Sequence, residues 1–292
     1  MPSKRLPNKH LPSKHLFDTC FSVLIVACAA LVTITLIWVL ADIVIKGASH
    51  ITWSFLTSEP NDAGRSGGIG TILVSTLLIL LVALGAAVPL GLGVAVWLSE
   101  FTVQNSRFSN TIGTTLDVLA GIPSIVYGLF GNAFFSLYLG LGFSILSGGL
   151  TLACMILPIF IRTCESGLSA VNNDWRKGAQ ALGMSRSVAI WHILLPAAAP
   201  AMIAGLILGI GRATAETAAL IFTSGYVDRM PGSLLDSGRA LAVHIYDLSM
   251  NVTGGDNAAY ASAFVLITLI ILLNTTAQSL IDRWFSQRIY AS

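Results

Sequence analysis

The sequence predicts an all-α, polytopic membrane protein with six transmembrane helices, and two observations predict it. Hydrophobic residues make up 54% of the 292 residues and charged residues only 10%, whereas about 25% of an ordinary soluble domain is charged. The uncharged stretches also reach the length of about 20 residues that a bilayer requires. This composition excludes a disordered chain, a collagen and a water-soluble enzyme.

The uncharged intervals place the helices one by one. They cover 19–41, 67–99, 118–161, 187–211 and 257–281. The third interval is long enough for two spans, and the glycines between positions 140 and 149 supply the break between them. Pro123 is expected to kink the first of the two. The sequence therefore predicts helices at 17–43, 69–96, 111–132, 147–165, 198–222 and 257–281.

The distribution of basic residues predicts the orientation of these helices. With the N-terminus inside, ten of the 16 Lys and Arg residues lie in cytoplasmic segments and four lie in external segments. Cytoplasmic loops of membrane proteins carry this excess of positive charge, so both termini are expected in the cytoplasm. The remaining two basic residues, Arg162 and Arg212, fall inside predicted helices.

The long connection at 166–196 is expected to form a helix-turn-helix on the cytoplasmic face, over 174–191. Gly183 is placed to make the left-handed turn between the two helices, and Ser185 is placed to cap the second. Small residues at 178, 179 and 181 allow close docking of another surface. Pro196 suits the first turn of the following span.

This connection carries a motif that resembles a known family. It reads Lys-Gly-Ala-Gln-Ala-Leu-Gly over 177–183, followed by nine residues and then Ile-Leu-Leu-Pro over 193–196. It resembles the EAA loop of binding-protein-dependent ABC importer permeases, whose pattern is E-A-A, three residues, G, nine residues, I-x-L-P. Lys177 and Gly178 stand where Glu and Ala are usual. The resemblance implies that an ATPase subunit docks on these residues: Lys177, Gly178, Ala179, Ala181, Leu182, Gly183, Ile193, Leu195 and Pro196.

A second resemblance covers about 65–285 and is narrower. The stretches 67–71, 89–93, 98–101, 119–131 and 211–218 are similar to phosphate permeases of the PstA and PstC pair, and the compact length favours the PstA type. Ala215 and Ala219 stand where Gly and Pro are usual. The resemblance implies a type I, MetI-like importer permease. Its expected parts are a basic tail at 1–16, a first helix and external loop at 17–64, a permease core at 65–285 and a cytoplasmic C-terminus at 286–292.

The same resemblance implies the partners. They are a second permease of the PstC type, two ATPase subunits of the PstB type and an external binding protein of the PstS type, assembled at a bacterial plasma (inner) membrane. ATP and Mg²⁺ are expected on the ATPase subunits and no cofactor on this chain, because no Gly-Lys dipeptide occurs and a phosphate-binding P-loop is excluded. The basic residues are too scattered to indicate a nucleic-acid partner.

Four ionisable residues inside or near the predicted spans are the candidates for a substrate pathway: Asp117, Arg162, Arg212 and Glu216. A charge at the centre of a span costs about 2.5–3.5 kcal/mol on insertion scales, so it faces a bundle interior or a watery cavity. Arg212 and Glu216 are four residues apart on a predicted helix and could pair.

Arg212 also lies 16 residues beyond Pro196, which is about 24 Å along a helix and beyond the bilayer midplane. A guanidinium there offers charge-assisted hydrogen bonds to an oxyanion such as phosphate.

Other interpretations remain open for each residue. Arg212 and Glu216 could only hold helices together, Arg162 could extend to the interface beside Glu165, and Asp117 could lie among lipid headgroups. The substrate could be another oxyanion such as molybdate or sulfate. The chain could also be an ATP-independent transporter.

The cysteines and histidines indicate neither catalysis nor a metal. The four cysteines and five histidines have no ligand or disulfide spacing, which predicts no metal site and no catalytic residue. His244 and Asp247 are expected to be solvated.

Overall fold

The computed structural model describes residues 12–103 and 106–289, and the side chains within 18–103 and 106–279. The described residues contain five helices long and apolar enough to cross a membrane. A sixth span results when the bent pair Arg107–Ala120 and Ser124–Tyr138 is counted as one interrupted crossing. The predicted all-α membrane fold is confirmed.

The predicted spans correspond to helices whose bounds match or extend the predicted ranges, with the exception of 111–132 and 198–222. The long helices are α1 (Pro12–Ala48), α3 (Gly70–Val96), α4 (Arg107–Ala120), α5 (Ser124–Gly131), α6 (Ile145–Ala170), α9 (Leu195–Thr214) and α12 (Asp256–Ile289). Three π-helical turns adjoin them, namely η2 (Trp97–Phe101), η3 (Asn132–Tyr138) and η4 (Ile190–Leu194). The short elements are α2 (Trp53–Thr57), β1 (Pro60–Asn61), η1 (Asp62–Gly64), β2 (Ser66–Gly67), α7 (Asn173–Ala181), α8 (Arg186–Ala189), α10 (Ala218–Ile221) and α11 (Leu241–Met250).

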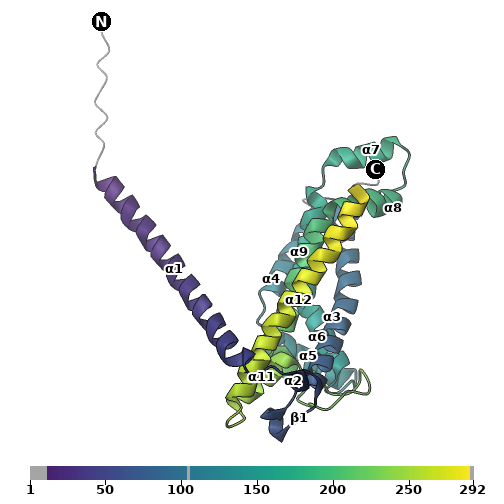
Figure 1. The fold of residues 1–292 in the computed structure, drawn as a ribbon. Helices are drawn as coiled ribbons and strands as arrows, with labels where there is room; N and C mark the ends of the chain where they lie inside the picture. Colours follow the sequence, from purple (N-terminus) through teal and green to yellow (C-terminus); the bar gives the residue numbers. More distant parts are fainter. Residues whose placement is uncertain (1–11, 104–105, 290–292) are drawn as a thin grey trace.

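The elements separate into two ends of an elongated bundle (Figure 1). The helices α7 and α8 lie at the end where α12 finishes. The antiparallel pair of β1 and β2 lies with α2 and α11 at the opposite end. The predicted alternation of cytoplasmic and external segments requires this arrangement.

Helix α1 stands away from the bundle and contacts it only at its C-terminal end, where it meets α12 (Figure 1). Lys46 Nζ donates a 2.9 Å hydrogen bond to Asp42 and lies 4.6 Å from the centre of the Tyr260 ring. The Tyr260 hydroxyl donates to the same Asp42 carboxylate at 3.0 Å. A polar contact therefore ties the first span to the last at the external end.

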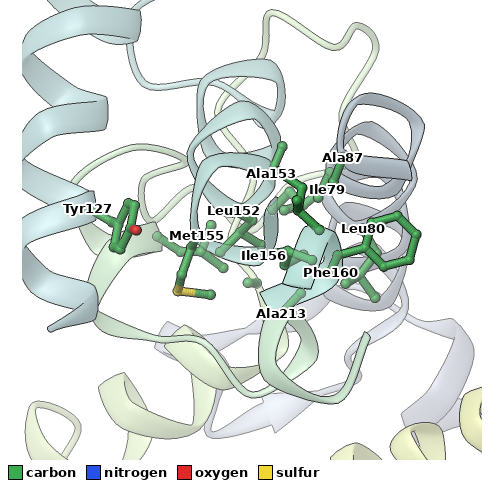
Figure 2. Packing of buried hydrophobic residues seen from close by; sticks show 14 of the residues in the cluster. Ile79, Leu80, Ala87, Tyr127, Leu152, Ala153, Met155, Ile156, Phe160 and Ala213 are labelled. Atoms are coloured by element: carbon green, nitrogen blue, oxygen red, sulfur yellow. The ribbon is translucent and has the colours of Figure 1, made fainter. Parts of the chain in front are cut away.

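Helix α6 forms the centre of the bundle, with α3 and α9 packed against it. Figure 2 shows Ile79 and Leu80 of α3 beside Leu152 and Ile156 of α6. Glycine brings α9 close to the same helix, because a Cβ atom at Gly209 would lie 2.7 Å from Cγ2 of Ile156. Helices in membranes associate through such small residues.

Two predicted spans differ from the structure. The expected helix at 111–132 is two helices, α4 and α5, which meet at an angle of 96° rather than at a mild kink. The expected helix at 198–222 ends at Thr214, and the short α10 begins after three further residues. Apolar composition predicts that a segment crosses the membrane, but it does not predict that the backbone turns within it.

The contact at Gly209 predicts a stability difference between two neighbouring glycines of α9. We expect Gly209→Ala to destabilise the fold by about 1–3 kcal/mol, because the added methyl group overpacks Ile156. Gly211→Ala is the matched control, since nothing lies within 4 Å of a Cβ atom there. Thermal unfolding of the purified complex measures both. Equal melting temperatures for the two variants would contradict the packing described.

Candidate functional site

The first interruption lies between α4 and α5. Helix α4 ends at Ala120, and Pro123 precedes the first residue of α5. Proline lacks a backbone N–H and disfavours helix at the residue before it, which stops α4 there. The Tyr127 hydroxyl donates a 2.9 Å hydrogen bond to the carbonyl oxygen of Leu119. Leu119 also accepts the backbone N–H of Ile122 at 3.1 Å, so a side chain of α5 adds a second hydrogen bond that ties α5 to the end of α4.

The second interruption lies between α9 and α10. The Glu216 side chain is 9% exposed, and its carboxylate accepts a 3.0 Å hydrogen bond from the backbone N–H of Ala219. Glu216 therefore caps α10 and lies outside α9. The expectation that Arg212 and Glu216 share one helix face and pair is wrong, because the helix that would align them ends at Thr214.

The two interruptions pack against each other. A Cβ atom at Gly128 of α5 would lie 2.8 Å from Cα of Ala219 in α10. Arg212 lies in the last turn of α9, directly before the second interruption. Interrupted backbone at membrane depth is tolerated only where it is buried in protein or lines an aqueous cavity. The meeting point of α5, α10 and the end of α9 is therefore the candidate pathway site.

Arg212 lies in the last turn of α9 and is partly exposed. It forms no ion pair and no side-chain hydrogen bond with any residue that the structure describes. The negative end of the α9 dipole favours a cation at this position. Its guanidinium can therefore offer its donors to an anion.

Arg162 and Asp117 have a different environment. Arg162 binds Asp117 in a bidentate manner, with Nε 2.9 Å from Oδ1 and Nη2 3.0 Å from Oδ2. Nη1 donates to Glu165 at 2.9 Å. Asp117 is therefore paired with an arginine, and two carboxylates surround this guanidinium. The cluster borders a cavity of about 440 Å³ lined by Leu98, Ser109, Asn110, Gly113, Thr114, Asp117, Arg162, Glu165 and Ser169.

The predicted helix-turn-helix is formed by α7 and α8, followed by η4. Gly183 has φ +73°, as a left-handed turn requires. The N–H of Met184 donates to Ala179 at 3.0 Å, which closes the end of α7. The Ser185 hydroxyl accepts the N–H of Val188 at 3.4 Å, so it caps α8 as expected.

The motif residues divide between an outer and an inner surface. Lys177, Gly178 and Ala181 are exposed, and Leu182 is 81% exposed. The inner surface contains the buried residues Ala179 and Leu195, the half-buried Ile193, and Pro196 in the first turn of α9. The outer surface therefore exposes Lys177 beside small and apolar residues.

Sequence reasoning missed two groups of residues. Glu100 and Arg176 form an ion pair between the end of α3 and α7. At the external end, His244 is fully buried, and Arg239 lies 3.3 Å from Asp247 and 3.4 Å from the His244 ring. The expectation that His244 and Asp247 are solvated is wrong, because α11 folds back onto the bundle. Gly64 has φ +88° and packs against the His244 ring, because a Cβ atom there would lie 2.6 Å from Cε1 of the ring. Its glycine is the residue in the sequence that fits this close approach.

Comparison with known proteins identifies the family. Residues 87–289 match the family model of binding-protein-dependent transport system inner membrane components. The chain belongs to this family. It is a permease subunit of an ABC importer, a multi-pass membrane protein that works with a partner permease and ATPase subunits.

Several relatives are similar over most of this permease. It is 30% identical to the probable ABC transporter permease YqgI of Bacillus subtilis (strain 168), covering 90% of this chain and 92% of that protein. It is 30% identical to the phosphate transport permease PstA 2 of Mycobacterium bovis (strain ATCC BAA-935 / AF2122/97), covering 90% and 86%. Identity reaches 40% with a PstA homologue of Mycoplasma pneumoniae (strain ATCC 29342 / M129 / Subtype 1), over 74% of this chain and 34% of that protein.

Solved structures share the fold of the permease. A chain of a bacterial alginate importer superposes with a TM-score of 0.58 at 15% identity, covering 92% of this chain and 99% of that chain. The MetNI methionine transporter gives 0.56 at 15% identity, covering 74% and 94%. These neighbours confirm the predicted MetI-like, type I architecture.

The buried histidine predicts a pH dependence of stability. Burial, and then the charge of Arg239, lowers the pKa of His244 from 6.5 to about 4. The unfolded chain therefore binds the proton more readily between these values, so the contribution to stability is complete above pH 6.5 and is lost as pH falls toward 4. We expect His244→Leu to flatten the melting temperature across this range.

His50→Gln is the control for this measurement, because His50 is exposed. It should keep the pH dependence of the parent protein. A His244→Leu curve parallel to that of the parent would contradict the burial of a neutral imidazole.

Proposed function

We propose that this chain is a PstA-type permease of a phosphate importer at the bacterial inner membrane. It would form the phosphate path with a second, PstC-type permease, while two PstB-type ATPase subunits bind ATP and Mg²⁺ and a PstS-type binding protein delivers phosphate outside. The relatives named as phosphate permeases support the substrate. The observation that carries the proposal is the position of Arg212, which pairs with no residue in the described part of the chain, where two interrupted spans meet.

The chemistry of Arg212 suits a transported oxyanion. Its guanidinium stays protonated at any relevant pH and presents planar donors that match a phosphate. Glu216 lies four positions away but gives its carboxylate to α10, so it does not neutralise this charge. One unpaired cation lowers the barrier to an anion without the deep well that several would create.

Arg162 has a different proposed role in the pathway. Its donors are directed to Asp117 and Glu165, so it holds α4 against α6 and positions the polar cavity beneath the first interruption. Asp117 is exposed there, and the formal charges of Arg162, Asp117 and Glu165 sum to −1, so the cluster would repel an anion that has passed Arg212. This pair would favour release over rebinding.

The alternatives differ in what supports them. An arginine does not select phosphate over sulfate or molybdate, so another oxyanion remains the second candidate. The ATP-independent transporter rested on a coupled Arg212 and Glu216, which the structure separates.

Removal of the Arg212 charge tests the pathway role. We expect Arg212→Gln to lower radiolabelled phosphate uptake at least about tenfold, because a tenfold loss requires only 1.4 kcal/mol of lost charge stabilisation. Arg212→Lys keeps the charge but loses the planar donors, and we expect intermediate uptake. Unlabelled sulfate and molybdate are the competitors that identify a different oxyanion.

Arg107→Gln is the control, since Arg107 is an exposed arginine at the start of α4. It should retain uptake. Normal uptake by Arg212→Gln, in a complex that still contains the ATPase subunits, would rule out the pathway role.

A further inference from the structure

An ion pair joins the end of α3 to α7, across 76 residues of sequence. Arg176 Nη2 lies 2.6 Å from Glu100 Oε1, and Nε lies 3.2 Å from Oε2, so the contact is bidentate. The two side chains are 18% and 11% exposed. Bidentate, partly buried pairs of this kind fix geometry more strongly than exposed pairs do.

The same arginine also binds the end of α6. Its Nη2 donates to the carbonyl oxygen of Leu168 at 2.8 Å, and its Nη1 donates to that of Val171 at 2.7 Å. These carbonyls belong to the last turn of α6 and to its C-cap, where the regular bonds of the helix end. The Leu168 carbonyl also accepts the N–H of Val171 at 3.3 Å. One side chain of α7 therefore holds the cytoplasmic ends of α3 and α6 together.

Glu100 is itself held in place. It lies in the π-helical turn η2, which continues α3, and the Ser99 hydroxyl donates to its Oε1 at 3.1 Å. A π-turn inserts one extra residue into a helix, and such turns are frequent at functional sites. A second π-turn, η4, leads from α8 into α9. Both helices that flank α6 in the core therefore change geometry where they approach the α7–α8 segment.

We propose that the Arg176–Glu100 pair is the positioning link through which movement of α7 reaches α3. Helix α7 is joined through the chain to α6 and α9, whereas α3 with its η2 turn ends at Phe101, far from α7 in the sequence, and this pair joins its end directly to α7. With the pair intact, force from the ATPase moves α7 and the cytoplasmic ends of α3, α6 and α9 as one body. Without it, the end of α3 follows only through its packing against α6 and α9, and it lags behind α7. This inference rests on the proposed coupling of α7 to an ATPase.

Charge-neutral variants of the whole importer test the link. In Glu100→Gln and Arg176→Gln we expect the ATPase subunits to remain bound and to hydrolyse ATP, while phosphate uptake per ATP falls at least tenfold. The double variant should lose no more than Arg176→Gln alone, because Arg176→Gln already removes the contact with Glu100 as well as the bonds to the end of α6. Arg107→Gln is the control and should keep the parent ratio.

Two results would overturn the link. One is an unchanged ratio of uptake to hydrolysis in both single variants. The other is a double variant whose loss is the product of the single losses, which would show that the residues act separately. Loss of the ATPase subunits from the complex in both single variants would assign the pair to assembly instead, and would also overturn the proposal.

A distance measurement tests the link without reference to the substrate. Spin labels at Val103→Cys and Asp174→Cys, both exposed positions, report the separation of the α3 end from α7. In a background without the native cysteines, the distance should be the same in the nucleotide-free and the ATP–vanadate-trapped importer. Arg176→Gln should make it change by several ångströms on trapping; a distance that changes equally in both proteins would contradict the link. If the parent complex took up no phosphate, the proposed substrate would be wrong. The distance measurement would still test the link, because it does not depend on the substrate.

Discussion

In a bilayer, a helix can be interrupted only where the protein itself satisfies the freed backbone groups. This constraint determines where the functional part of this permease lies. At the α4–α5 bend, backbone turns and the Tyr127 hydroxyl bind the last carbonyls of α4. At the α9–α10 break, Glu216 accepts the N–H of Ala219. Because each interruption needs protein around it, the two are packed together, and Arg212 lies beside them. The proposed path, and the position of Arg212 without an ion-pair partner among the described residues, thus follow from one requirement.

The core explains how this site is held. Helix α6 runs uninterrupted from Ile145 to Ala170 and contacts both interrupted spans, α4–α5 and α9–α10. It also contacts α3, and its cytoplasmic end contacts Arg176 of the ion pair. Its inner end holds Arg162 and the carbonyls that Arg176 binds. The cytoplasmic helix-turn-helix and the intramembrane site are therefore two ends of one packed unit, whose parts are positioned by hydrogen bonds to arginine.

Much of the fold could be predicted from the sequence because its signals are local. Uncharged intervals predict the spans, and Gly183, Ser185 and Pro196 predict the turn, the cap and the next helix. What composition could not predict was backbone direction within an apolar segment. Pro123 indicated a kink, but the 96° bend depends on packing against α6 and α10. Ala215 and Ala219 stand where Gly and Pro are usual, so the residues that would have indicated the second break are missing from the sequence.

The candidate site was predicted in part for the same reason. Rare intramembrane charges identify Arg212, Arg162 and Asp117 by their cost alone, and no fold is needed for that step. The ion-pair partners of these residues could not be predicted, because the fold brings together residues that are far apart in the sequence. Asp117 is 45 residues from Arg162, and Glu100 is 76 residues from Arg176. In the sequence, Glu100 is only part of the stretch 98–101 that resembles phosphate permeases, and Arg176 is only one of the ten basic residues assigned to the cytoplasm.

The central claim is that the meeting point of the two interruptions is a water-accessible path for an anion. The most direct measurement places a cysteine at the exposed Ala215, in an importer without its native cysteines, and follows its reaction with a charged, membrane-impermeant thiol reagent. The account predicts modification in at least one nucleotide state and slower modification when phosphate is present. A cysteine that stays unreactive in every state, or reacts at a rate that phosphate does not change, would contradict it.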